Sequence, residues 1–136
     1  MNISNVGAQR LILVWWLLKV TYGLLFVVAG ADKFINLVTY WEKYISRFVL
    51  NILSVESSIL ILAVGILEIV IGLLILIPGW TKVGATLASV WLLVIALNLL
   101  GFNIYYDIAV RDVVMAIGAA CLCLLTDVNK ELNPDS

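Results

Sequence analysis

One carboxylate, Glu68, lies in the middle of an apolar run from Ile59 to Ile77. At 3.6 residues per turn, Gly65, Glu68 and Gly72 fall on one stripe of a helix, so another helix can approach closely beside the acid. A charged side chain at mid-bilayer costs roughly 2.5 to 3.5 kcal/mol, so Glu68 is expected to be paired, protonated or facing a cavity. It is interpreted either as a buried ligand or proton site or as a polar clamp between two helices.

The preceding apolar run, from Leu11 to Ala31, carries Lys19 and Tyr22 on one helical face. That face is expected to point inward, and it comprises Lys19, Tyr22, Gly23, Phe26, Gly30 and Lys33. Lys19 lies about 12 Å from the start of its run and Glu68 about 13.5 Å from the end of the next. If the two helices are antiparallel, the sequence predicts that Lys19 contacts Glu68 directly or through one water. The alternative is that Lys19 extends to the nearer membrane surface.

A second set of polar residues lies near the predicted helix ends. If the four predicted helices alternate in direction, this set gathers near one surface of the membrane: Asp32, Lys33, Asn98, Arg111 and Asp112. One interpretation is helix-end charge that is neutralised locally. The other is an entrance or a site for a headgroup.

Residues 36–53 are predicted to form an amphipathic helix in the headgroup plane, because apolar residues recur there at helical spacing and polar residues occupy the opposite face. Trp41, Tyr44 and Phe48 are its expected interfacial anchors. The functional alternative is a lid over a cavity in the bundle.

Composition identifies the class of protein. The 136 residues are 64% hydrophobic and 12% charged, their mean hydropathy is +1.14, and soluble domains carry about 25% charged residues. A net charge of −1 and the absence of histidine exclude a basic nucleic-acid-binding surface and a histidine metal site. No metal-ligand cluster and no paired nucleophile and base are evident, so no catalytic residue is assigned. Cys121 and Cys123 are expected to be free thiols.

The predicted fold is all-α: an integral membrane four-helix bundle in a single membrane domain, residues 1–136. Its helices are expected at about 11–31, 57–77, 83–102 and 108–126, with the interfacial helix at about 36–53 between the first two. Residues 1–10 and 127–136 are expected to be short polar tails. An even number of spans places both termini on one side, although the Lys and Arg counts of the two sides barely differ.

Four segments resemble the DoxX family of small four-helix membrane proteins. They are GLLFVVAGADKF at 23–34, EIVIGLLILIPG at 68–79, TKVGA at 81–85 and YDIAVRD at 106–112. The methylamine-utilisation MauE proteins have a similar layout and are the second choice. The resemblance implies a bacterial inner membrane, cytoplasmic termini, and an association with redox or quinone chemistry.

Three functions are weighed, and whether the protein is an enzyme stays open. The first is a non-catalytic subunit or assembly factor of a redox-associated membrane complex, with the bilayer and a membrane protein or a second copy as partners. The second is a quinone or other lipophilic-ligand site built from Glu68, Lys19 and Tyr22 with Phe26 and Trp91, without a covalently bound cofactor and with a partner that supplies electrons. The third is a small oligomeric transporter.

Overall fold

The computed structural model describes residues 3–45, 47–101 and 105–132. Side chains are described from Asn5 onward within these ranges, apart from that of Phe48, so the anchor role predicted for Phe48 lies outside the described residues. The elements in chain order are α1 (Ile3–Ile35), η1 (Trp41–Tyr44), α2 (Arg47–Leu53), α3 (Ser57–Leu76), α4 (Thr81–Leu100) and α5 (Tyr106–Leu132).

Four helices, α1, α3, α4 and α5, are long and apolar enough to cross a membrane. Each has at least 20 residues and therefore a length of about 30 Å or more, which matches the hydrocarbon core of a bilayer. Leu and Ile side chains point outward along all four, as expected where the surrounding solvent is lipid. The predicted all-α membrane bundle of four long helices is confirmed.

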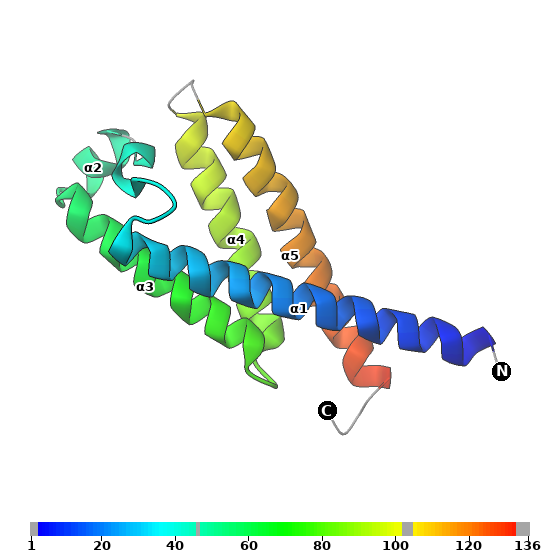
Figure 1. The fold of residues 1–136 in the computed structure, drawn as a ribbon. Coiled ribbons are helices and arrows are strands. Elements are labelled where there is room, and N and C mark those ends of the chain that lie inside the picture. Colours follow the sequence, from blue (N-terminus) through cyan, green and yellow to red (C-terminus); the bar gives the residue numbers. More distant parts are fainter. Residues whose placement is uncertain (1–2, 46, 102–104, 133–136) are drawn as a thin grey trace.

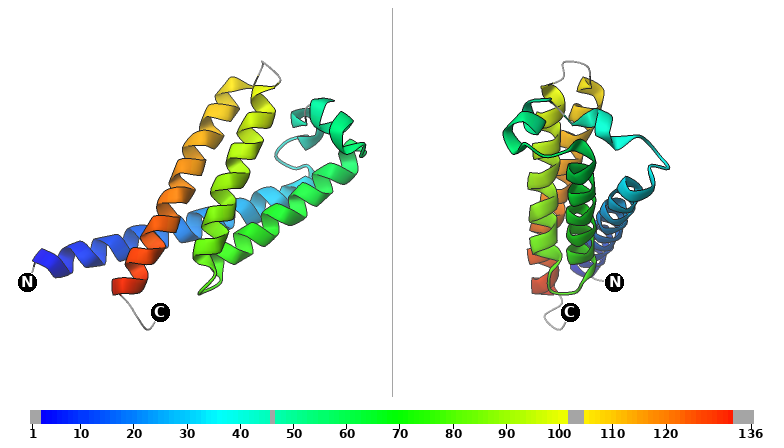
Figure 2. Two further views of the ribbon diagram at one scale, coloured as in Figure 1. Left: turned by 180° about the vertical axis from the view of Figure 1, so that it is seen from behind. Right: turned by 90° about the vertical axis from the view of Figure 1, so that its left-hand side faces the viewer.

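The four helices are arranged as two pairs (Figure 1). α1 packs along α3, and α4 packs along α5. The first pair crosses the second obliquely, and both termini lie at the end of the bundle that also contains the α3–α4 turn (Figure 2).

Glycines allow α1 and α3 to approach until their backbones touch. A Cβ atom added at Gly30 would lie 2.5 Å from the carbonyl oxygen of Gly65, and one added at Gly72 would lie 2.8 Å from the carbonyl oxygen of Gly23. The close approach predicted beside Glu68 is therefore confirmed, and α1 is the neighbouring helix.

Small residues have the same effect between α4 and α5. Ala85, Ala88, Ala116 and Ala119 are all buried, and the Ser89 hydroxyl donates a hydrogen bond to the carbonyl of Ala116 at 2.9 Å. In a membrane, such small residues let backbones approach and increase van der Waals contact.

The segment between α1 and α3 differs from the predicted single helix at 36–53. It contains an extended stretch, the 3-10 turn η1 and the short helix α2. The Asp32 carboxylate accepts the backbone N–H groups of Leu37 and Val38, both at 2.9 Å, and Asn36 has a positive φ of 50°. These contacts end α1 and turn the chain, so a helix cannot start at residue 36.

The outer helices also extend beyond the predicted bounds. α1 starts at Ile3 rather than near residue 11, and α5 continues to Leu132 rather than ending near residue 126. Much of each predicted polar tail is therefore helical.

Candidate functional site

Glu68 lies in the contact between three helices. Its side chain is buried in the bundle, and Oε2 accepts a hydrogen bond from Nζ of Lys33 on α1 at 2.5 Å. Oε1 faces the indole N–H of Trp91 on α4 at 3.5 Å, at the long limit for a hydrogen bond. Both carboxylate oxygens therefore have a donor in the protein.

The tilt of side chains on antiparallel helices explains the Lys33–Glu68 pair. Gly30 of α1 faces Gly65 of α3, and each charged residue follows its glycine by three positions. Side chains lean toward the N-terminus of their own helix, so Lys33 leans back toward Gly30 and Glu68 leans back toward Gly65. The two groups therefore meet at the level of the glycine contact.

The predicted pairing of Lys19 with Glu68 is wrong. When α1 and α3 are aligned so that Gly30 faces Gly65, Lys19 and Glu68 are about 12 Å apart along the helix axes. Their side chains also lean in opposite directions, because the helices that carry them are antiparallel. Counting depth from the predicted helix ends ignored this lean.

Tyr22, the third member of the predicted buried site, contacts α5 instead. Its hydroxyl donates a hydrogen bond to the carbonyl oxygen of Met115 at 2.7 Å. Lys19, Tyr22 and Glu68 are all buried on the inner side of the bundle, but the structure does not bring them into one site.

Trp41 of η1 covers the Lys33–Glu68 pair. The Lys33 ammonium lies 3.8 Å from the centre of the Trp41 ring, a cation–π distance, and 3.4 Å from the carbonyl oxygen of Ala29. The Trp41 indole N–H donates to the Asp32 carboxylate at 2.6 Å. Asp32 thus holds Trp41 as well as the turn after α1.

The second predicted polar set lies around this ion pair, although its members have different roles. Asp32, Lys33 and Asp112 are buried, and Asp112 lies within electrostatic range of Lys33 and Glu68. Arg111 is exposed, with Nε 3.9 Å from Asp112. Asn98 donates to the carbonyl of Tyr44 at 2.7 Å and so ties α4 to η1.

The expected anchors Trp41 and Tyr44 are half-buried and make contacts inside the protein. Trp41 binds Asp32, whereas the Tyr44 ring packs edge-on against Tyr105 with ring centres 5.0 Å apart. η1 therefore closes this end of the bundle.

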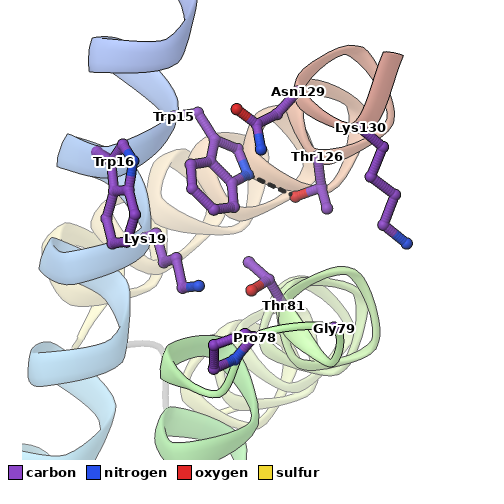
Figure 3. Close-up of a pocket in the computed structure, with 9 residues that line it drawn as sticks. All are labelled: Trp15, Trp16, Lys19, Pro78, Gly79, Thr81, Thr126, Asn129 and Lys130. Atoms are coloured by element: carbon purple, nitrogen blue, oxygen red, sulfur yellow. Dashed lines mark hydrogen bonds between the residues drawn. The ribbon is translucent and has the colours of Figure 1, made fainter. Parts of the chain in front are cut away.

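Lys19 instead faces a pocket of about 260 Å³ at the opposite end (Figure 3). The pocket lies between α1, the α3–α4 turn and the end of α5, and its lining residues are Trp15, Trp16, Lys19, Pro78, Gly79, Thr81, Thr126, Asn129 and Lys130. The Lys19 ammonium is 4.7 Å from the centre of the Trp15 ring and 5.1 Å from that of Trp16.

The pocket wall is fixed by hydrogen bonds. The Trp15 indole N–H donates to the Thr126 hydroxyl at 2.9 Å, and that hydroxyl donates to the carbonyl of Leu122 at 2.8 Å. The Thr81 hydroxyl donates to the carbonyl of Ile75 at 3.0 Å. The sequence interpretation missed this pocket, although Trp15 and Lys19 are four residues apart on one helical face.

These arrangements differ in the chemistry that they allow. The Lys33–Glu68 pair is closed and internally neutral, and it holds three helices together. The pocket around Lys19 is open and carries cations. Within the described ranges, no group of three or more Cys, Asp or Glu side chains has the geometry of a metal site.

Comparison with known proteins identifies the family. The model of the DoxX family matches residues 14–103, which include α1 from its fourth turn, η1, α2, α3 and all of α4. Neither a curated protein nor a solved structure matches the chain. The match covers well over half of the sequence and includes both Lys33 and Glu68; the chain belongs to the DoxX family.

Proposed function

We propose that the protein is a non-catalytic subunit or assembly factor of a redox-associated membrane complex. The observation that carries this proposal is the closed Lys33–Glu68 ion pair, in which Glu68, the single acid of α3, is 4% exposed and bonded to the neighbouring helix. An acid used in this way fixes the register of α1 against α3. It is not positioned to exchange protons with a bound substrate.

A quinone site at Glu68 receives less support. Such a site needs an open space beside a proton donor or acceptor, but both oxygens of Glu68 face donors of the protein. The other two polar groups of the predicted quinone site lie elsewhere. Lys19 lies beside two indole rings, and the Tyr22 hydroxyl bonds to the carbonyl oxygen of Met115. A transporter pathway through Glu68 meets the same objection, because the acid is neutralised by Lys33.

The η1–α2 segment is our proposed docking surface for a membrane protein partner or a second copy. Lys43 and Arg47 are exposed there, whereas Glu42 of the same segment accepts a hydrogen bond from Ser57 at 3.0 Å. Two exposed cations on one short segment form a surface suited to an acidic partner. Membership in the DoxX family supports a location in the bacterial inner membrane, with both termini in the cytoplasm.

Charge reversal on this segment tests the proposal. We expect Lys43→Glu with Arg47→Glu to release the partner that co-purifies with the tagged protein in mild detergent, without changing its melting temperature. The matched control is Arg10→Glu, an exposed charge reversal at the opposite end of the bundle, which should retain the partner. Retention of the partner by the double variant would contradict the proposed surface.

Apolar replacement of the ion pair tests the non-catalytic role. A Lys33→Met/Glu68→Leu variant removes both charges together, so we expect a folded protein that still assembles with its partner. Quinone extracted from the purified wild-type protein, and absent from this folded variant, would instead favour the oxidoreductase function.

A further inference from the structure

The pocket around Lys19 has the charge and position of an anion site. We propose that it binds the phosphate group of an anionic phospholipid, with the phosphate at Lys19, Lys130 at the edge of the pocket as a second positive charge, and the acyl chains running along the outer face of α1. This site is separate from the Lys33–Glu68 pair and does not depend on the function proposed above.

The ammonium group of Lys19 has no anionic partner in the described part of the chain. Its side chain is only 3% exposed, and the ion pairs found among described residues use Lys33, Lys82 and Arg111 instead. The ammonium group lies against two indole rings, those of Trp15 and Trp16. An ammonium group with so little exposure and no counter-ion is costly, which favours an external anion in the pocket that it faces.

The rest of the lining favours an anion with several oxygens. Lys130 is a second cationic residue of the lining, and no Asp or Glu is found among the described residues that line the pocket. Thr81 is the first residue of α4, so the positive dipole end of that helix lies beside the pocket. The amide of Asn129 is a further polar group in the wall. A phosphate, with its negative charge shared among oxygens, matches two cations and a helix N-terminus.

The position of the pocket favours a lipid as the source of this phosphate. It lies beside the turn that joins α3 to α4, where two membrane-spanning helices end. Trp16 and Trp80 are 51% and 55% exposed near this end, as is usual for side chains at the level of the lipid headgroups. Val20 and Leu24, which follow Trp16 by one and two turns along α1, are exposed apolar residues that would meet the acyl chains. Basic pockets between membrane helices are known to hold anionic headgroups.

Native mass spectrometry of the full-length protein in mild detergent tests the proposal. The probes are dioleoylphosphatidylglycerol, which is anionic, and dioleoylphosphatidylcholine, which has the same chains and no net charge. We expect phosphatidylglycerol to bind about tenfold more tightly, because the phosphatidylcholine ammonium is repelled by Lys19 and Lys130. Equal affinity for the two lipids would overturn the proposal.

Substitutions of single lysines test whether the preference for phosphatidylglycerol arises in this pocket. Lys19→Met keeps the length and apolar stem of the side chain, and it should bring the affinity for phosphatidylglycerol close to that for phosphatidylcholine. Lys130→Met, an exposed change that leaves the packing intact, should weaken phosphatidylglycerol about fivefold. Lys43→Met at the opposite end is the matched control and should leave the preference unchanged. A preference retained in folded Lys19→Met and in Lys130→Met would place the lipid elsewhere and overturn the assignment.

Competition with inorganic phosphate distinguishes a lipid from a free anion. We expect about 10 mM inorganic phosphate to leave bound phosphatidylglycerol in place. The free ion lacks the contacts that the acyl chains make with α1. Displacement of the lipid by phosphate at that concentration would show that the pocket recognises the free ion, and would overturn the lipid part of the proposal.

Discussion

Lys33 and Glu68 bring opposite charges together where each residue is at most 5% exposed. Removing both groups from water is costly, and their attraction offsets that cost only while both are present. The pair therefore specifies how α1 meets α3 more than it raises overall stability. Trp41 strengthens this specificity, because it contacts the Lys33 ammonium and binds Asp32 at the same time.

A double-mutant cycle measures this coupling. Glu68→Leu alone leaves the Lys33 ammonium buried without a carboxylate and should lower the free energy of unfolding by about 3 to 5 kcal/mol. The Lys33→Met/Glu68→Leu double variant should recover most of that loss. Reversible unfolding in detergent micelles is the measurement, and losses that simply add would show that the two side chains do not interact.

Asp32 is expected to control the turn after α1. Asp32→Leu removes the acceptor for the N–H groups of Leu37 and Val38, and hydrogen bonds to a charged group contribute about 1.5 to 3 kcal/mol. Amide exchange at Leu37 and Val38 should then become roughly 10- to 100-fold faster, whereas Asp32→Asn, which keeps an acceptor oxygen, should have a smaller effect. Unchanged exchange in Asp32→Leu would show that other contacts hold the turn.

The types of the site residues could be predicted from the sequence, but the pairing could not. Lys19 and Lys33 share the inner face of α1, and only the register of α1 against α3 decides which of them meets Glu68. That register depends on backbone contact at Gly30 and Gly65, and on the lean of long side chains toward the helix N-terminus. Lys33 was assigned to a separate cluster because it lies close to the end of its helix.

At the scale of the helices, close packing depends on glycine at the α1–α3 contact. Gly65 and Gly72 lie one helical turn on either side of Glu68, so the backbones approach closely where the ion pair forms. α4 and α5 use alanine in the same way. Each pair is thus held by small residues, which raise the number of van der Waals contacts in a solvent that provides little hydrophobic driving force.

Gly72→Ala tests this contact. The added methyl group would lie 2.8 Å from backbone atoms of Gly23 and Val27, so α1 and α3 must separate, at a cost of about 1 to 3 kcal/mol. Gly7→Ala is the matched control, because nothing lies within 4 Å of its added Cβ, and it should be neutral or stabilising by up to about 1 kcal/mol. Equal melting temperatures for the two variants would contradict the proposed role of Gly72.

Hydrophobic runs and the Pro78–Gly79 turn were enough to predict the four long helices. They were not enough for the segment from Asn36 to Leu53, because its helical spacing of apolar residues also occurs in the separate elements η1 and α2. The break at Asn36 results from a tertiary contact, in which the Asp32 carboxylate binds backbone N–H groups that follow it. Local periodicity does not contain that information.

At the scale of the whole molecule, the two ends of the bundle differ in character. One end contains the neutral Lys33–Glu68 pair under η1, and the other contains the cationic pocket around Lys19, between the α3–α4 turn and the end of α5. Figures 1 and 2 show these elements at opposite ends of the bundle. Four crossings of the bilayer place these ends on opposite membrane surfaces.

Cysteine labelling in vesicles tests this topology. Lys43→Cys and Glu131→Cys place thiols at opposite ends of the bundle, so a membrane-impermeant maleimide should label one in right-side-out vesicles and the other in inverted vesicles. Cys121 and Cys123 lie about 13 to 17 Å from the end of α5 and should stay unlabelled in the wild-type protein, because thiolate formation requires water. Labelling of both introduced thiols from the same side would contradict four crossings.

The order of synthesis gives the Lys33–Glu68 pair a further consequence. The two residues are 35 positions apart, so Glu68 leaves the ribosome about 2 to 7 s after Lys33. During that interval α1 is already at the membrane with an ammonium group that has no carboxylate to bind. Lys33 is two residues from the end of α1, and a small outward shift of the helix keeps the ammonium in contact with water. We therefore expect α1 to move inward when α3 arrives, so that the first span takes its final depth only after the second has been inserted.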